Sequence, residues 1–205
     1  MSILVVKSVF VILLSCAVAV SFSTSRADYP EEIPFVPTPF EVVDRMLELA
    51  EVKKDDVVYD LGCGDGRIVI RAAKKFGARG VGIEMDTTLI ETARKTAQEE
   101  GVSHLVEFRS EDALKADISA ATVVTLYMLP WFNEAMKPSF RKHLKPGSRI
   151  VAHDFGIEGW TPDKTEKLPE IEHGPGGFKH QHTLFVWKIK AEAESNAPAP
   201  GPKLP

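Results

Sequence analysis

The segment VVYDLGCGDG, residues 57–66, constrains the fold of this chain more than any other. It is an apolar run that ends on an acid, Asp60, and then breaks into glycines at alternate positions. A second apolar run, GVGIE, ends on Glu84. A strand, a glycine turn, a helix and a second strand that ends on an acid are typical of a nucleotide-binding βαβ unit. Glycines permit positive φ and close backbone approach, and the second acid accepts ribose hydroxyls. The pattern therefore predicts an adenosine site.

The charge of the turn indicates which adenosine compound fits. The dinucleotide fingerprint G-x-G-x-x-G requires a glycine at the position of Arg67. Asp60 and Asp65 would face the phosphates of such a ligand, and no lysine of a P-loop lies in the turn. Carboxylates suit a ligand that carries an ammonium and a sulfonium instead, and S-adenosylmethionine is such a ligand. The glycines of the turn are Gly62, Gly64 and Gly66.

The run DLGCGDG resembles the first motif, acid-x-G-x-G-x-G, of class I (seven-strand) S-adenosylmethionine-dependent methyltransferases, and Glu84 resembles their second motif. The segments PFVPTPFEVV, ATVVTLYMLP and RIVAHDF are similar more specifically to the small lysine methyltransferase family whose eukaryotic members modify the ATP synthase c-subunit and the adenine nucleotide translocase. The likeness covers about residues 34–189. It implies an α/β fold, a Rossmann-like doubly wound sheet that is mostly parallel and has a C-terminal antiparallel strand pair.

Apolar periodicity and turn residues predict the elements of this fold. Thr38-Pro39-Phe40-Glu41 predicts a capping box at the start of the first helix, and Pro138 predicts a kink or a split in the last one. A final strand pair is predicted to be antiparallel, joined by a glycine-rich connection. Helices are predicted over 39–51, 66–76, 86–100 and 131–143, and strands over 56–60, 80–84, 106–109, 121–127, 149–155, 167–172 and 183–189.

In an open parallel sheet the ligand lies across the carboxyl ends of the strands, so the candidate donor site lies there. Asp60 is predicted to hold the methionine ammonium, directly or through water, or else to cap the following helix. Gly62 and Gly64 allow close approach to the methionine part, and Glu84 is predicted to bind the ribose hydroxyls. Asp112 is the preferred partner of the adenine amine, with Glu111 as the alternative.

The entry segment PFVPTP is predicted to be extended, because each residue before proline is pushed away from helical angles. In the resembling family this segment covers the methyl-donor site, which implies that Thr38 belongs to the cofactor-binding set. The alternative is a rigid lead into the first helix.

The candidate acceptor site follows the fourth and fifth predicted strands. The run YMLPW, which begins at Tyr127, stands where base and glutamine methyltransferases carry an N-P-P-Y type tetrad. It offers an aromatic, largely apolar mouth that suits a lysine stem, although such a cluster is also ordinary core. His153 and Asp154 are candidates to accept the proton that a lysine loses before attack. His180 and His182 are weak evidence for a metal site without a third ligand, so no metal is predicted.

These residues predict a protein-lysine N-methyltransferase that uses S-adenosylmethionine as the methyl donor. A small-molecule methyltransferase and a non-catalytic S-adenosylmethionine-binding module are the alternatives. A net charge of −4 argues against nucleic acid as a partner, because phosphate binding leaves a basic stripe. An acidic body suits a basic protein substrate instead.

The two ends of the chain are predicted to lie outside the catalytic domain, which is expected over 28–190. Residues 1–27 are predicted to be a cleaved signal peptide or an uncleaved membrane anchor, with a lipoprotein signal at Cys16 as a further alternative. Membrane association would run through the apolar residues 8–22. Lys7 favours export of the domain, whereas the methyl donor is expected inside the cell, so the side of the membrane stays open. The tail, 191–205, is predicted to be disordered.

Overall fold

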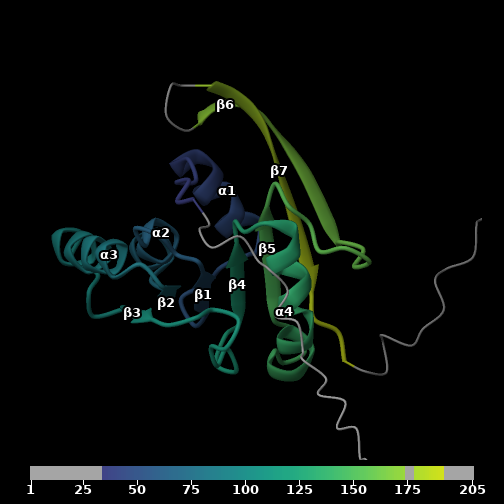
Figure 1. The fold of residues 1–205 in the computed structure, drawn as a ribbon, viewed down its shortest axis with the longest axis horizontal. Coiled ribbons are helices and arrows are strands. Elements are labelled where there is room, and N and C mark those ends of the chain that lie inside the picture. Colours follow the sequence, from purple (N-terminus) through teal and green to yellow (C-terminus); the bar gives the residue numbers. More distant parts are fainter. Residues whose placement is uncertain (1–33, 174–177, 192–205) are drawn as a thin grey trace, which may run out of the picture. The chain divides into compact units, whose positions relative to one another are not determined.

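The computed structural model describes residues 34–173 and 178–191 of the chain (Figure 1). The predicted signal peptide or anchor, the glycine-rich connection at 174–177 and all but the first residue of the predicted tail lie outside the described residues. Within the described part, no helix combines the length and the apolar character needed to cross a membrane.

Helices and strands alternate from α1 to β3 in the described chain, whereas β4 follows β3 directly and β5, β6 and β7 follow one another. The elements match the predicted ones to within a few residues. The largest difference lies in the last two strands, which are longer than predicted. The helices are α1 (Phe40–Leu49), α2 (Arg67–Phe76), α3 (Thr87–Glu99) and α4 (Pro130–His143), and the strands are β1 (Val57–Leu61), β2 (Arg79–Glu84), β3 (Val106–Ser110), β4 (Val123–Leu126), β5 (Arg149–His153), β6 (Lys164–His173) and β7 (Phe178–Lys188).

The strands form one 7-stranded sheet in the order β3-β2-β1-β4-β5-β7-β6. Strands β1 to β5 are parallel, and β7 is antiparallel to both β5 and β6. This confirms the predicted doubly wound sheet with its C-terminal antiparallel pair. The strand order reverses between β1 and β4, and ligands of open α/β sheets bind at the carboxyl ends of the strands beside such a reversal.

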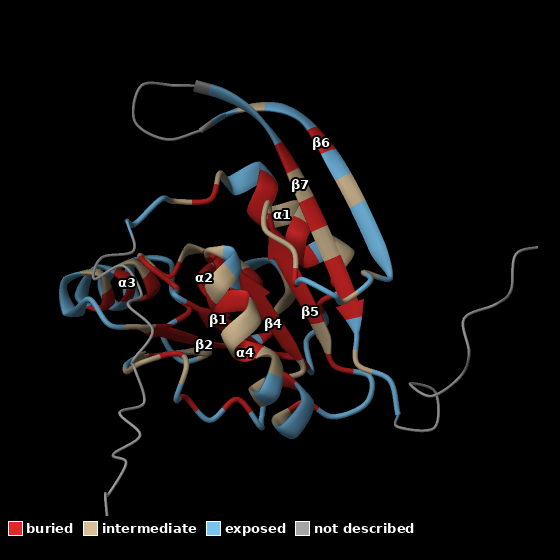
Figure 2. Cartoon of the chain, turned by 45° about the vertical axis from the view of Figure 1, so that its right-hand side comes forward, coloured by how far each residue is buried: buried red, intermediate tan, exposed pale blue. Residues whose placement is uncertain are grey.

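Each face of the sheet is covered by its own helices (Figures 1 and 2). Val58 and Val123 pack in one apolar cluster with α1, α2 and α3, whereas their neighbours Tyr59 and Val124 pack with α4 on the other face. Alternate side chains of a strand point to opposite faces, so both faces of β1 and β4 are buried. The near-continuous apolar composition of these strands follows from this arrangement.

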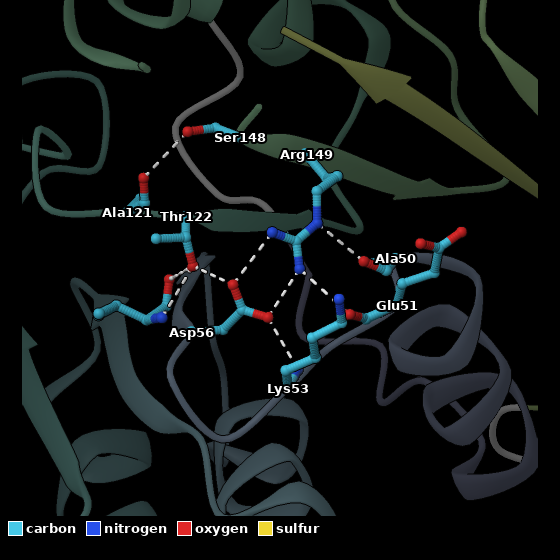
Figure 3. A network of polar contacts seen from close by, with 9 residues as sticks. Ala50, Glu51, Lys53, Asp56, Ala121, Thr122, Ser148 and Arg149 are labelled. Atoms are coloured by element: carbon cyan, nitrogen blue, oxygen red, sulfur yellow. Dashed lines mark hydrogen bonds and ion pairs between the residues drawn. The ribbon is translucent and has the colours of Figure 1, made fainter. Parts of the chain in front are cut away.

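A polar network joins the amino ends of the strands, opposite the predicted site (Figure 3). The guanidinium of Arg149 donates to Asp56 Oδ1 at 3.0 Å and to Oδ2 at 2.7 Å, and Thr122 Oγ1 donates to Oδ1 at 2.6 Å. Burial raises the pKa of Asp56, but these bonds outweigh burial and leave that pKa below its ordinary value. The network therefore ties β5 to the start of β1 and leaves the opposite strand ends to the ligand.

Two local predictions concern the helices: a capping box at the start of α1, and a kink or a split of α4 at Pro138. The capping box is wrong, because Pro39 is the N-cap of α1 and no side chain caps that helix; the Thr38 hydroxyl instead faces His153. Pro138 lies inside α4, which runs through it from Pro130 to His143. The helix is therefore not split at that proline.

Candidate active site

The glycine turn after β1 has the backbone that its sequence predicts. Gly62, Gly64 and Gly66 have φ angles of 78°, 53° and 77°, in the left-handed region that favours glycine. The amides of Gly62 and Cys63 both donate to the carbonyl of Ile83 at 2.9 Å, which fixes the turn against the end of β2. The two acids of the βαβ pattern are thereby brought to one place.

Asp60 lies at the floor of this turn and is 3% exposed. Its Oδ1 accepts a hydrogen bond from Thr125 Oγ1 at 2.6 Å, so β4 orients the carboxylate. Burial and, to a smaller extent, the negative charges of Asp65 and Glu84 raise the pKa of Asp60 to about 7, against the lowering effect of the Thr125 bond. A cationic ligand would stabilise the ionised form of this buried acid, which fits the predicted contact with the methionine ammonium.

Glu84 ends β2 beside the same turn. Its Oε2 accepts from the Gly64 amide at 3.1 Å, and its Oε1 accepts from the amides of Met85 and Asp86 at 2.7 and 3.0 Å. The carboxylate is thus held by backbone donors on both oxygens and is only partly buried. An acid positioned by the chain in this way fits the predicted ribose contact, because each carboxylate oxygen can accept more than one bond.

Asp112 lies in the loop after β3, the neighbour of β2 in the sheet. Its Oδ1 accepts from the Leu114 amide at 3.0 Å and its Oδ2 pairs with Lys115 Nζ at 2.9 Å. The side chain therefore fixes its own turn. Its predicted role at the adenine stays a prediction, and so does the alternative, Glu111.

Residues 35–39 of the entry segment lie over the glycine turn. Arg67 Nη1 donates to the carbonyl of Thr38 at 2.9 Å, and the same guanidinium pairs with Asp65 at 2.6 Å. The Phe35 ring lies so close to Gly64 that a Cβ added to that glycine would approach it to 2.2 Å. The structure thus places this segment where the donor site is expected, with Phe35 still 46% exposed.

Tyr127 and His153 form the floor of the candidate acceptor site. Their rings stack with centroids 3.9 Å apart and an interplanar angle of 30°. Burial and the charge of Asp154 raise the pKa of Tyr127 to about 12, so its hydroxyl stays protonated near neutral pH. The predicted residues at the ends of β4 and β5 therefore do meet, with His153 fully buried against the partly exposed ring of Tyr127.

Asp154 follows β5 with a φ of 59°, an angle that few residues other than glycine adopt. Its amide donates to the Thr183 carbonyl at 2.7 Å and its Oδ1 accepts from the Thr183 amide at 2.8 Å. Burial raises the pKa of Asp154, but the His153 contact and the Thr183 amide outweigh burial and hold that pKa well below the ordinary range. Asp154 is therefore ionised and fixed against β7.

His182 is a site residue whose place the sequence pattern did not indicate. It is fully buried on β7, and its Nδ1 lies 2.7 Å from His153 Nε2 and 3.3 Å from Asp154 Oδ2. His180 Nε2 lies 3.2 Å from the same carboxylate oxygen. The alternation of the two histidines correctly placed them on one strand face, but no sequence signal showed that this face meets β5.

The order of the strands, the glycine turn and the two acids at the strand tips together define a class I S-adenosylmethionine-dependent methyltransferase. Solved structures similar to this chain include methyltransferases in complex with S-adenosylhomocysteine. More narrowly, residues 60–164 match the model of the ANTKMT methyltransferase domain, and the chain belongs to that family.

Several methyltransferases are similar to this chain. A protein-lysine N-methyltransferase of Saccharolobus islandicus is 44% identical over 159 residues, which cover 77% of this chain and 96% of that protein. The human lysine N-methyltransferase of the ATP synthase c-subunit is 32% identical over 131 residues, 64% of this chain and 55% of the human one. An RNA methyltransferase from Salinibacter ruber, solved with S-adenosyl-L-homocysteine, is 54% identical with a TM-score of 0.69 over 77% of this chain and 95% of that one.

Proposed function

We propose that this chain transfers the methyl group of S-adenosylmethionine to the ε-amine of a protein lysine. The observation that carries the proposal is the aromatic floor formed by Tyr127 and His153, with Asp154 beside it, in a chain related to lysine methyltransferases. The run after β4 offers no N-P-P-Y type clamp for a planar base or amide. An apolar, aromatic surface suits the stem of a lysine, and an ionised Asp154 attracts its ammonium group.

The chain's own residues have a limited chemical task. The donor supplies a methyl group that is already activated on a sulfonium, so the amine displaces the sulfur directly and no metal step enters the proposal. Asp60 and Glu84 are proposed to hold the two ends of the donor, and Thr38 and Asp112 to complete its site. Tyr127 shapes the approach of the amine, and His153 accepts its proton beside the ionised Asp154. Positioning of the reacting atoms and exclusion of water supply most of the acceleration in such a reaction.

RNA methylation is a second candidate, because the Salinibacter ruber protein with 54% identity is an RNA methyltransferase. The charge of this chain disfavours it. The net charge is −4, whereas proteins that bind nucleic-acid phosphates carry basic patches. Small-molecule methylation remains as the other enzymatic alternative.

A labelling experiment separates these candidates. The full chain is incubated with methyl-labelled S-adenosylmethionine and an extract of the cells that express it, and the product is treated with ribonuclease or with protease. We expect the label to survive ribonuclease, to be released by protease and to appear as methyllysine after hydrolysis. Label in nucleotides, or in a small molecule alone, would overturn the proposal.

Two substitutions test site residues in that assay, and a third serves as the matched control. Asp60→Asn removes the charge proposed to hold the donor and should abolish labelling. Asp163→Asn changes an acid that pairs with Lys190 away from the glycine turn and should leave labelling within about twofold. Tyr127→Ala should lower labelling at least tenfold while S-adenosylhomocysteine still binds, because Tyr127 is placed on the acceptor side. Equal labelling by Tyr127→Ala and the intact chain would remove Tyr127 from the site.

Membrane association through residues 8–22 is also part of the proposal, supported by their apolar sequence. The intact mass of protein recovered from cells distinguishes a chain cleaved after Ala27 from one that keeps its first residues. Fractionation of the same cells gives the compartment. A full-length chain found only in the soluble fraction would contradict both the signal peptide and the anchor.

A further inference from the structure

A cluster of three histidines and one aspartate joins the tip of β5 to the part of β7 that extends beyond it. Strand β7 pairs with β5 only from Leu184 onward, so His180 and His182 lie on the stretch that pairs with β6 alone. Asp154 Oδ2 lies at their centre, 3.2 Å from His153 Nε2, 3.3 Å from His182 Nδ1 and 3.2 Å from His180 Nε2. The cluster therefore connects the acceptor floor with β7.

The cluster is graded in burial from one end to the other. His153 and His182 are fully buried, the Asp154 side chain is 13% exposed, and the His180 side chain is 55% exposed. At the inner end, His153 stacks under Tyr127 and its Nδ1 faces the Thr38 hydroxyl at 3.4 Å. Successive polar atoms within hydrogen-bonding reach thus run from the buried Thr38 hydroxyl, beneath the candidate acceptor site, to the exposed His180.

The shortest contact in the cluster indicates a shared proton. His153 Nε2 and His182 Nδ1 are 2.7 Å apart, a hydrogen-bond distance that requires one ring nitrogen to donate and the other to accept. Ligand atoms of His153, Asp154 and His182 also lie close enough together for a metal ion to be considered. However, two nitrogens at about 2.0–2.1 Å from one tetrahedral Zn²⁺ are about 3.3 Å apart. The observed spacing favours a hydrogen-bonded pair.

Resting on the function proposed above, we infer that His153, His182, Asp154 and His180 form a proton-release path for the substrate ammonium. The N–H bond of the ammonium breaks, its electron pair stays on the amine nitrogen, and the proton passes by way of the Thr38 hydroxyl to His153 Nδ1, which that hydroxyl faces. From there it leaves through His182 and the Asp154 carboxylate to His180 and solvent. The neutral amine then attacks the methyl group, so the path restores itself in every turnover.

The charges around the path fit this direction. Burial and the neighbouring His153 lower the pKa of His182, against Asp154, which raises it, so His182 is neutral and ready to accept. Asp154 is ionised at rest and compensates a proton held on either ring, and it takes up the proton only transiently as the proton passes from His182 to His180. Thr38 and Tyr127 also face the path. On β6, Ile171 pairs with His180 and shares its face, whereas Lys167 and Glu170 pair with Thr183 and Gln181, which lie on the opposite face of β7 from the two histidines.

The first test uses the free protein and needs no methyl acceptor. In the full chain with ¹⁵N-labelled histidine, nuclear magnetic resonance follows the titration of His180 and the state of the His153–His182 pair. We expect one ring nitrogen of this pair to be protonated and the other not, and His182→Asn to shift the titration of His180. If the titration of His180 were the same in the intact chain and in His182→Asn, the path would be overturned. Stoichiometric metal on these residues, found by elemental analysis of the purified chain, would also overturn it.

The second test measures turnover against pH with the methyl acceptor identified by labelling, or with a synthetic peptide that contains its modified lysine. Asn at position 182 can accept the hydrogen bond from His153 but cannot pass a proton on. We expect His182→Asn to lower kcat about 10- to 100-fold at pH 7 and to recover toward pH 10, where the amine loses its proton unaided. His180→Gln, at the exposed end, should show a smaller loss that added buffer reverses.

The outcomes of the second test separate two kinds of failure. An intact chain that methylates no lysine would refute the proposed function. If the intact chain methylates lysine but His182→Asn lowers kcat by the same factor at every pH, the path is refuted and the proposed function stands. Binding of S-adenosylhomocysteine by calorimetry, unchanged in His182→Asn, excludes a folding defect. If this variant does not fold, His180→Gln and the resonance measurements on the intact chain decide.

Discussion

Thr38 Oγ1 lies 3.4 Å from His153 Nδ1, although the two residues are 115 positions apart in the sequence. Both side chains are buried, at 3% and 0% exposure. The contact joins the segment that covers the glycine turn to the tip of β5, and so connects the candidate donor site with the candidate acceptor site. It also explains why Thr38 does not cap α1, because its hydroxyl is turned toward the histidine.

Thr38→Val should therefore destabilise the chain by about 1 kcal/mol, since the buried histidine loses the hydroxyl as a partner while the volume is kept. Urea unfolding of the full chain measures the change. Thr92→Val is the matched control, because the Thr92 hydroxyl bonds only to the Thr88 carbonyl on the exposed surface of α3. Equal losses in the two variants would show that the Thr38–His153 contact contributes nothing particular to stability.

Asp60→Asn should stabilise the chain without ligand at pH 8. In the folded chain the pKa of Asp60 is raised to about 7 from its ordinary value of 3.8, so the folded state binds a proton more tightly than the unfolded state does. Stability then falls as pH rises from about 4 through 7, and the ionised acid costs on the order of 2–4 kcal/mol above that range. Thermal unfolding at pH 5 and 8 should show an advantage of the asparagine variant that grows with pH. A constant difference would contradict the raised pKa.

Donor binding should release protons through the same residue. A bound ammonium favours the ionised carboxylate, so it lowers the pKa of Asp60 and expels the proton held there. We expect a release of about half a proton per ligand at pH 7 and almost none at pH 9. Calorimetry in buffers of different ionisation enthalpy measures this quantity with S-adenosylhomocysteine. Affinity independent of pH between 5 and 8 would remove Asp60 from contact with the ammonium.

Gly64→Ala and Gly101→Ala separate backbone strain from crowding of the site. Gly64 has a φ of 53° and Gly101 a φ of 71°, so each alanine costs about 1 kcal/mol of strain. Only at Gly64 does the added Cβ meet a neighbour, the Phe35 ring at 2.2 Å, whereas nothing lies within 4 Å of it at Gly101. We expect similar losses of stability but a weakening of S-adenosylhomocysteine binding by tenfold or more only in Gly64→Ala. Equal binding by both variants would argue against close approach of the ligand at Gly64.

The donor side of the site was predictable because its signals are local. The acid and the glycines of the turn lie within a few residues of each other, and α2 connects them directly to β2 and Glu84. A parallel βαβ unit admits essentially one handedness, so a correct prediction of its strands brings Asp60 and Glu84 together. Tyr127 and Asp154 were placed by the same rule, as the residues that follow parallel strands.

The sequence by itself determined the sheet, the glycine turn and which acids stand at the strand tips, since those features follow from periodicity and from φ angles that only glycine adopts readily. Tertiary structure alone decided that Thr38 faces His153 and that His182 lies 2.7 Å from the same ring. The register of β7 against β5 sets the second contact, and a shift by one residue would turn His182 to the opposite face. That register depends on packing along the whole strand, which no local pattern encodes.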